Sequence, residues 1–300
     1  MEFTNNLLAP ITLPLSVVII ASNEEERIGE CLDSVSRLVD DIVVVDAHSR
    51  DTTVAIAASK GARIFQRSWV GYSDQKNFGN DQARHDWILS LDADERISPE
   101  LAESLRRTFV HGEPDRAAFA IRFQSYFGTR RVRFGAWNPE WHLRIFDRRK
   151  CDWNDVCVHE GLRGVEGFRV GRLEGVIRHY TVASRVELTG KMVRYSDLFA
   201  AKLRVCGQEP GWSNIWLNPV WRFARDYILR LGVLDGAVGF IIAWEAACYT
   251  HSKYVKARNA WPCPYRPVVG VFEAESLIGL VFAASFAFGP GLFLAASLAG

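Results

Sequence analysis

Residues 87–100, WILSLDADERISPE, combine an apolar run with a cluster of acidic residues, and this pattern decides the predicted fold. An apolar run, Trp87 to Leu91, is typical of a buried strand, and the carboxylates of Asp92, Asp94 and Glu95 follow it directly. In an open α/β sheet, ligands bind at the carboxyl ends of the strands. Acidic side chains at such an end therefore predict a site for a metal ion and a ligand that carries phosphate groups.

The spacing of the two aspartates supports this interpretation. If the chain stays extended, Asp92 and Asp94 face the same side, roughly 6–7 Å apart at about 3.3 Å per residue. That separation suits one hard cation and its phosphate-bearing ligand. Glu95 is expected to support the pair. Ser98 and Pro99 then predict a helix with a serine cap and proline at its first position.

The residues before this stretch alternate between strand-like and helix-like patterns. Buried strands are predicted at 15–20, 41–46 and 62–65, and helices at 28–38, 52–60 and 72–86. This order predicts a parallel sheet with right-handed crossovers. The chain contains neither GxGxxG after the first strand nor GxxxxGK[ST], which argues against dinucleotide-binding and phosphate-loop enzymes.

The composition is that of a folded chain without a strong overall charge. Of its 300 residues, 48% are apolar, and 36 basic residues nearly balance 35 acidic ones, so no nucleic-acid partner is expected. The six cysteines show no CxxC or metal-ligand spacing, which favours reduced thiols in the cytosol. No basic region followed by an apolar core begins the chain, so no secretion signal is expected.

The pattern is looser after residue 111. Residues 141–146 alternate and predict an edge strand, whereas 156–160 (VCVHE) and 175–180 (GVIRHY) each place a histidine near a strand end. Residues 186–258 are helical in character. Within them, 216–231 combines aromatic residues with three arginines, as either a helix at a membrane surface or a core helix with a solvated arginine face.

The last 25 residues carry no charge. They are long enough to cross a bilayer, which needs about 20 residues. Gly289-Pro290-Gly291 divides them into two shorter pieces, so a membrane hairpin or a packed helix pair is an alternative.

Seven strings, in their order and spacing, resemble the inverting family 2 glycosyltransferases of GT-A fold, and within them the lipopolysaccharide-core β-glucosyltransferase group. The strings are LSVVIIASNEEERI (15–28), DIVVVDAHSRDTT (41–53), DQKNFG (74–79), DWILSLDADERISPEL (86–101), VHE (158–160), RHY (178–180) and RDYILRLGVLDGAVGF (225–240). The resemblance implies an α/β fold with a Rossmann-like, mostly parallel sheet and a helical C-terminal region. An apolar C-terminal tail follows from composition.

We therefore expect three parts. Residues 1–185 would form the catalytic domain, with a nucleotide-sugar half at 15–111 and an acceptor half at 112–185. Residues 186–262 would form a helical membrane-proximal region, and 263–300 an apolar tail that could anchor the chain.

The resemblance also implies roles for individual residues. The residues implied to bind the donor are Ala21, Asn23, Glu24, Asp46, Lys76, Asp92 and Trp137. Asp94, in a DxD element with Asp92, and His179 would hold Mg²⁺ or Mn²⁺. Glu160 would be the base that deprotonates the acceptor hydroxyl, with Asp155 in reserve. Without the family, Lys76 could be a plain surface lysine and His179 a core histidine.

The implied function is metal-dependent transfer of a hexose, glucose by the resemblance, from a UDP-sugar to a glycolipid acceptor of the lipopolysaccharide inner core. The enzyme would work at a membrane surface, on the cytoplasmic face of the inner membrane. One alternative is a non-catalytic membrane scaffold that binds sugar nucleotides. Another is an aspartate-based phosphotransferase, because DADE superficially resembles DxDx[TV], although that chemistry expects the acid pair after the first strand.

Overall fold

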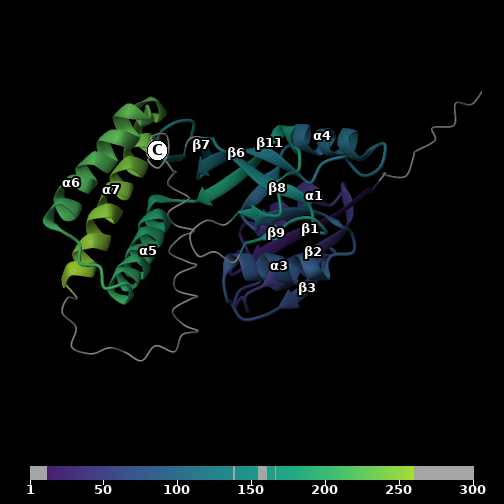
Figure 1. Ribbon diagram of the computed structural model, residues 1–300, viewed down its shortest axis with the longest axis horizontal. Coiled ribbons are helices and arrows are strands. Elements are labelled where there is room, and N and C mark those ends of the chain that lie inside the picture. Colours follow the sequence, from purple (N-terminus) through teal and green to yellow (C-terminus); the bar gives the residue numbers. More distant parts are fainter. Residues whose placement is uncertain (1–11, 138, 155–160, 166, 260–300) are drawn as a thin grey trace, which may run out of the picture. The chain divides into compact units, whose positions relative to one another are not determined.

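The computed structural model describes residues 12–137, 139–154, 161–165 and 167–259 (Figure 1). The described residues form two compact units. The first takes them from Met1–Phe123, Trp141–Asn154 and Gly161–His179, and the second from Gln124–Glu140 and Tyr180–Gly300.

The first elements in the chain alternate strands and helices, as predicted. They are β1 Leu13–Ala21, α1 Ile28–Val35, β2 Val39–Asp46, α2 Thr53–Ser59, β3 Arg63–Gln66, α3 Tyr72–Gln82, β4 Trp87–Asp92, β5 Glu95–Ile97 and α4 Pro99–Phe109. Strands dominate the next part, with β6 Ala118–Phe127, β7 Arg130–Arg131, a 3-10 turn η1 Gly135–Trp137, β8 Trp141–Asp147, β9 Asp152–Trp153, β10 Leu162–Arg163 and β11 Val170–Val182. The remaining elements are helical: α5 Arg185–Val205, α6 Trp212–Ala224, a π-helical turn η2 Arg225–Leu229, a 3-10 turn η3 Gly232–Asp235 and α7 Gly236–Asn259.

Within the described residues, the main sheet has the order β3-β2-β1-β4-β8-β6-β11-β5, and β7 pairs with β6. The pairs β1-β2, β1-β4 and β2-β3 are parallel, whereas β8 is antiparallel to both of its neighbours. The predicted α/β fold is confirmed, with the parallel strands β1 to β4 inside a mixed sheet. Residues 263–300, the predicted tail, lie outside the described residues.

The parallel strands form because their apolar side chains are buried on both faces of the sheet. In β1, Val17 and Ile19 belong to one apolar core, whereas Val18 and Ile20 belong to the core on the other face. Strands of this kind read as continuous apolar runs. The run at 87–91 is likewise buried throughout.

The prediction of an edge strand at 141–146 was wrong. β8 lies between β4 and β6 and pairs with both. Its first three residues are partly exposed and its last four are buried, so burial changes along the strand and does not alternate between its faces. The predicted cap before α4 is confirmed, because the Ser98 side chain accepts a hydrogen bond from the Leu101 amide and Pro99 opens the helix.

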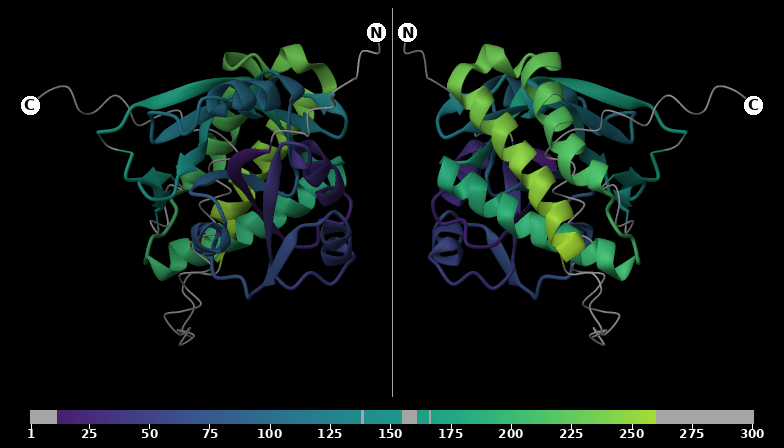
Figure 2. Two further views of the ribbon diagram at one scale, coloured as in Figure 1. Left: turned by 90° about the vertical axis from the view of Figure 1, so that its right-hand side faces the viewer. Right: turned by 90° about the vertical axis from the view of Figure 1, so that its left-hand side faces the viewer.

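The helices of the second unit pack around α7, which contacts both α5 and α6 (Figure 2). The aromatic-basic segment 216–231 is not one regular helix. It comprises the end of α6 and the π-helical turn η2, and Leu231, with φ of 60°, separates η2 from η3. Among the described residues, one helical stretch, Gly232–Arg258, is long and apolar enough to cross a membrane, although 56% of its most apolar window is buried.

Candidate active site

The second aspartate of the acidic stretch lies in a turn that follows the first. Asp92 is the last residue of β4, Ala93 and Asp94 form the turn, and Glu95 begins β5. The expectation of an extended chain through Asp94 was therefore wrong. The turn sends the chain back into the sheet, where Glu95 pairs with His179 of β11.

Asp92 is held between two cations. Its Oδ1 lies 3.3 Å from Lys76 Nζ, and its Oδ2 lies 3.2 Å from Arg144 Nη2. Burial acts to raise the pKa of Asp92, but the Lys76 and Arg144 charges outweigh it and hold that pKa well below its usual range. Asp92 is thus a carboxylate at any pH at which the protein works.

Glu95 contacts both the Asp92 backbone and Arg144. Its side chain is fully buried; Oε2 accepts a hydrogen bond from the Asp92 amide at 3.0 Å, and Oε1 lies 2.7 Å from Arg144 Nη2. Burial raises the pKa of Glu95 to about 7, against the opposing charge of Arg144. Glu95 therefore positions Asp92 and Arg144 and is shielded from solvent.

Two histidines lie in the same cluster. His179 Nε2 is 3.3 Å from Asp94 Oδ2; burial lowers the pKa of His179, but the Asp94 charge reverses this and raises it overall. His142 packs edge-on against Phe123 with ring centroids 4.6 Å apart. Burial, together with the Arg144 charge, lowers the pKa of His142 to about 4, so His142 is neutral near pH 7.

Lys76 reaches the cluster from α3, and it is not a surface lysine because its side chain is only 3% exposed. The helix approaches the sheet closely at Gly79, where a Cβ would lie 2.4 Å from Val18 Cγ1. Asn77 fixes the other side of α3 through paired hydrogen bonds of 2.9 Å with the Trp153 backbone. The Trp153 ring then lies under Lys76, 4.8 Å from Nζ. Asn77 and Gly79 thus position α3, and with it the lysine.

The predicted nucleotide residues gather at the carboxyl ends of the parallel strands. In the sheet register Ala21 pairs with Asp46, and Ile20 with Asp92. Asn23, with φ of 55°, accepts from the Arg50 amide through Oδ1, and its own amide donates to Ser49 Oγ. These bonds tie the loop after β1 to the loop after β2.

Glu24 and Asp46 take part in the same loop network. The Glu24 amide donates to Thr53 Oγ1 at 2.8 Å, and its carboxylate pairs with Arg27 at 3.0 Å. Asp46 is fully buried; it accepts bonds from the amide and hydroxyl of Ser49 and from Gln66 Nε2. These contacts hold the Asp46 carboxylate at the strand end.

The remaining predicted site residues are Trp137, Asp155 and Glu160. Trp137 belongs to the second unit, where it is 4% exposed and packs in an apolar core, with its ring 6.4 Å from that of Phe127. Asp155 and Glu160 lie outside the described residues. The flanking residues are described: the Asn154 amide donates to the Gly161 carbonyl at 3.0 Å, next to Trp153.

Sequence reasoning missed Arg144 and His142. Both lie on β8, and they join the cluster because β8 is antiparallel to β4 and β6, a pairing that no local pattern of residues 141–147 reveals. In the part of the chain that the structure describes, no group of three or more histidine, cysteine and acidic side chains is arranged to hold a metal ion unaided.

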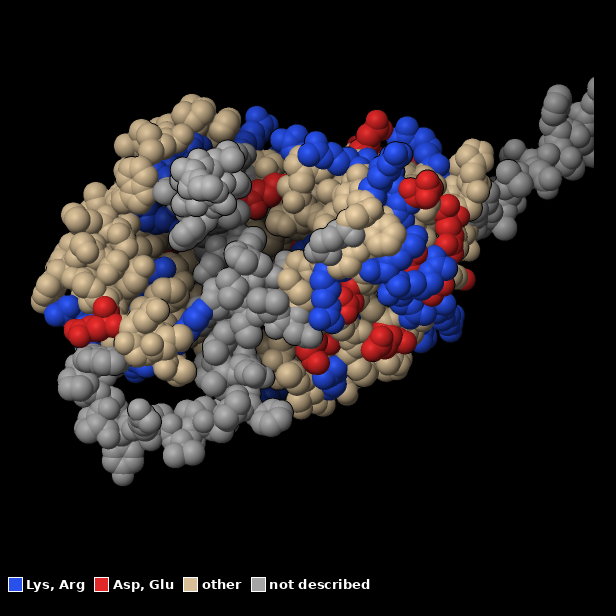
Figure 3. Space-filling model, viewed as in Figure 1, with Lys and Arg blue, Asp and Glu red and all other residues tan. Residues whose placement is uncertain are grey.

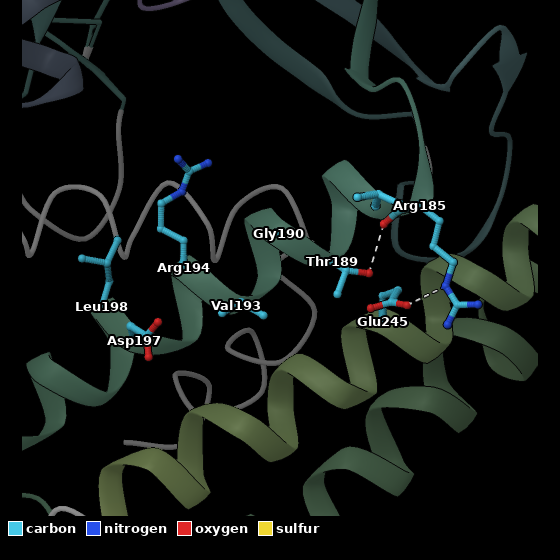
Figure 4. Close-up of a pocket in the computed structure, with 9 residues that line it drawn as sticks. Arg185, Thr189, Gly190, Val193, Arg194, Asp197, Leu198 and Glu245 are labelled. Carbon is cyan, nitrogen blue, oxygen red and sulfur yellow. Dashed lines mark hydrogen bonds and ion pairs between the residues drawn. The ribbon is translucent and has the colours of Figure 1, made fainter.

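A hollow of about 800 Å³ lies elsewhere, on α5 and α7 of the second unit (Figure 4). Arg185 Nε pairs with Glu245 Oε1 at 2.9 Å at one end of it, and Asp197 lies toward the other. None of the predicted site residues lines it. The candidate site is therefore the cluster around Asp92.

Sequence comparison identifies the family. The family model described as "Glycosyl transferase family 2" matches residues 16–168, just over half of the chain. The lipopolysaccharide core biosynthesis glycosyltransferase LpsC of Rhizobium meliloti is 30% identical over 269 residues, which cover 86% of this chain and 96% of that protein. An uncharacterized glycosyltransferase of Rickettsia typhi is 29% identical over 237 residues, or 76% of this chain and 80% of the relative. The chain belongs to glycosyltransferase family 2, and the protein is a glycosyltransferase.

Two solved structures show weaker similarity. Residues 1–349 of Staphylococcus aureus TarS, in complex with UDP-GlcNAc, align with a TM-score of 0.42 at 13% identity, over 82% of this chain and 91% of that one. Glucosyl-3-phosphoglycerate synthase of Mycobacterium tuberculosis, with Mn²⁺, UDP-glucose and phosphoglyceric acid, aligns with a TM-score of 0.30 at 25% identity. That alignment covers 42% of this chain and less than half, 48%, of the synthase.

Proposed function

We propose that the protein transfers a hexose, glucose by family resemblance, from a UDP-sugar to a hydroxyl of a glycolipid acceptor of the lipopolysaccharide inner core, with inversion. The observation that carries this proposal is the cluster at the carboxyl end of β4. There a carboxylate pair lies beside a buried lysine and a buried arginine. The similarity to a lipopolysaccharide core glycosyltransferase supports the acceptor class.

The chemistry of the cluster suits a diphosphate leaving group. As the sugar bond breaks, negative charge develops on the diphosphate, and a fixed cation in a water-poor site stabilises it. Lys76 supplies such a charge from a 3% exposed position, and its contact with Asp92 keeps its ammonium at the strand end. Asp46 and the loop after β1 would bind the uracil-ribose part, since they occupy the same edge of the sheet.

The donor atoms present fit Mg²⁺ or Mn²⁺. Asp94 and His179 offer a carboxylate oxygen and an imidazole nitrogen that are 3.3 Å apart, and Asp92 stands two residues away. Hard cations of this kind are bound through one or two carboxylates and complete their coordination with phosphate oxygens and water. When bound, such an ion would supply further positive charge to the leaving diphosphate.

Inverting transfer also needs a base for the acceptor hydroxyl. We assign this role to Glu160, with Asp155 in reserve, on the family motif. On either side of this segment, the described residues Asn154 and Gly161 are bonded to each other, and Trp153, next to Asn154, packs against Lys76. General-base catalysis is typically worth about 10²- to 10⁴-fold in rate.

The acceptor is lipid-borne in this proposal, so the enzyme would act at the cytoplasmic face of the inner membrane. The long apolar stretch Gly232–Arg258 and the uncharged residues 276–300 support membrane association. Trp137 stays a candidate for sugar stacking on the family resemblance alone, since its side chain is 4% exposed and packs in an apolar core.

The test is a panel of nucleotide sugars incubated with purified protein and a membrane lipid extract. Consumption of one UDP-hexose and a lipid mass gain of one hexose are expected. Asp94→Asn and Glu160→Gln should each abolish transfer, but only Asp94→Asn should weaken metal-dependent UDP binding in calorimetry. Near wild-type turnover of Glu160→Gln would refute the base assignment, and UDP binding without any transfer would favour the scaffold alternative.

No observation favours the phosphotransferase alternative. Asp92, the nucleophile that it would require, is engaged at both oxygens by Lys76 and Arg144. Incubation with a labelled phosphate donor should therefore leave no label on the protein.

A further inference from the structure

Exposed apolar side chains concentrate on α6, η2 and η3 of the second unit. We call this surface the apolar face and define it by six residues that each expose between 50% and 66% of their area: Trp212, Trp216, Leu217, Trp221, Leu229 and Leu234. Figure 3 shows much of the surface in the region of α6 and α7 in tan, with few charged side chains on it. A soluble monomer rarely keeps an apolar patch of this kind without a partner.

The face is largely left out of the packing of the unit. In α6, Trp212, Trp216, Leu217 and Trp221 keep 50–66% of their area exposed, whereas Ile215 is 3% exposed and lies on the buried side. Trp216 contacts His251 and Trp212 lies beside Arg258, but at least half of each tryptophan stays exposed. Tryptophan is the residue that most suits a boundary between water and lipid, because its ring is apolar and its N–H is polar.

The charges of the same segment favour an anionic partner. Helix α6 has no acidic residue, and the two carboxylates that follow it, Asp226 and Asp235, are 1% and 7% exposed. Asp226 is shared by three arginines: Arg222 Nε at 2.5 Å, Arg225 Nε at 2.9 Å and Arg230 Nη1 at 3.8 Å. One carboxylate thus faces three guanidinium groups, which leaves positive charge beside the apolar face.

The three guanidinium groups are partly exposed. The Arg222, Arg225 and Arg230 side chains are 17%, 16% and 25% exposed, so Arg230 is the most accessible of them. Anionic phosphate oxygens are the acceptors that a guanidinium group fits best. A second copy of this chain is a poorer partner, because a two-fold contact through this face would bring two arginine clusters together.

We propose that the apolar face docks on the surface of an anionic lipid bilayer, with its tryptophan and leucine side chains at the headgroup-acyl boundary and the arginines around Asp226 contacting lipid phosphates. This inference extends the membrane association of the proposed function. Its test uses no glycosyl transfer, so failure of the docking surface can be told apart from failure of the proposed reaction.

The experiment is flotation of the full-length chain with vesicles of phosphatidylcholine, with and without phosphatidylglycerol. We expect binding to the anionic vesicles, weakened by salt, and a loss of about tenfold or more in the double variant Trp216→Ser/Leu217→Ser. The matched control is Val186→Ser/Val193→Ser, because these α5 side chains are 83% and 52% exposed but lie outside the apolar face. Arg230→Gln should reduce the preference for anionic over neutral vesicles.

Thermal unfolding of each variant establishes that it is folded. If Trp216→Ser/Leu217→Ser fails to fold, flotation of Leu229→Ser/Leu234→Ser, with substitutions in η2 and η3, tests the same proposal. Equal flotation of the double variant and the wild type would overturn the proposal, as would no binding of the wild type to either vesicle. A wild-type dimer that becomes monomeric in the double variant, with unchanged flotation, would also overturn it and assign the face to a second copy.

Discussion

Replacing Arg144 with methionine tests whether the acidic cluster depends on a cation that comes from β8. Arg144 Nη2 lies 2.7 Å from Glu95 Oε1 and 3.2 Å from Asp92 Oδ2, and its side chain is 11% exposed. Methionine keeps most of the apolar stem but removes the charge, and with it the contact of the guanidinium carbon with the Phe123 ring at 5.0 Å. The variant therefore leaves two neighbouring carboxylates with Lys76 as the remaining cation beside Asp92.

The expected cost follows from how deeply each carboxylate is buried. Removing one partner of a buried ion pair costs about 3–5 kcal/mol. Glu95 is fully buried, but its pKa is already raised to about 7, so it can take up a proton when Arg144 is removed, which places the cost at the lower end of this range. The Asp92 side chain is 27% exposed and keeps Lys76, so its share is screened. We expect Arg144→Met to lower the free energy of unfolding by about 3 kcal/mol.

The assay is urea unfolding followed by tryptophan fluorescence, with Glu95→Gln and the double variant completing a mutant cycle. Because the two side chains touch, we expect a coupling free energy of about 1–3 kcal/mol. Arg107→Met is the control, since its pair with Glu174 is exposed on both sides and its loss should leave the free energy of unfolding nearly unchanged. A loss below about 1 kcal/mol in Arg144→Met, with additive effects in the cycle, would refute the reasoning.

Three further predictions address the same unit. Gly79→Ala should lower the free energy of unfolding by about 1–3 kcal/mol and weaken UDP binding, because its Cβ would lie 2.4 Å from Val18 Cγ1 and push α3 from the sheet. Gly190→Ala is the control: its Cβ would have no atom within 4 Å, so it should stabilise helix α5. Lys76→Met should weaken UDP about tenfold or more in calorimetry but leave uridine affinity unchanged; equal losses for both ligands would contradict a diphosphate role. Burial acts to raise the pKa of Asp41, but bonds from Ser16, the Arg84 amide and Arg63 lower it overall. Asp41 therefore stabilises the fold above the unfolded-state pKa, and this contribution is lost as pH falls through the folded-state pKa. The stability difference between wild type and Asp41→Asn should accordingly shrink in urea titrations below about pH 4, and a difference independent of pH would contradict this.

The sequence by itself determined the parallel half of the sheet and the edge at which the site lies. Strands such as β1 and β4 are apolar on both faces, so their periodicity is visible locally, and acidic residues that follow them must meet at one edge of a parallel sheet. The resemblance carried by DQKNFG implied a donor-binding role for Lys76, although the residues alone left a surface lysine open. For this part of the chain, local pattern and tertiary structure carry the same information.

Only the tertiary structure decided which cations complete the cluster and how the aspartates are arranged. Arg144 and His142 reach Asp92 and Phe123 because β8 inserts between β4 and β6, and pairing of distant antiparallel strands leaves no mark in either strand alone. The turn at Ala93-Asp94 forms because Glu95 pairs with His179, more than eighty residues later in the chain. Charges brought together across such distances shift one another's pKa values, and that coupling depends on the fold as a whole.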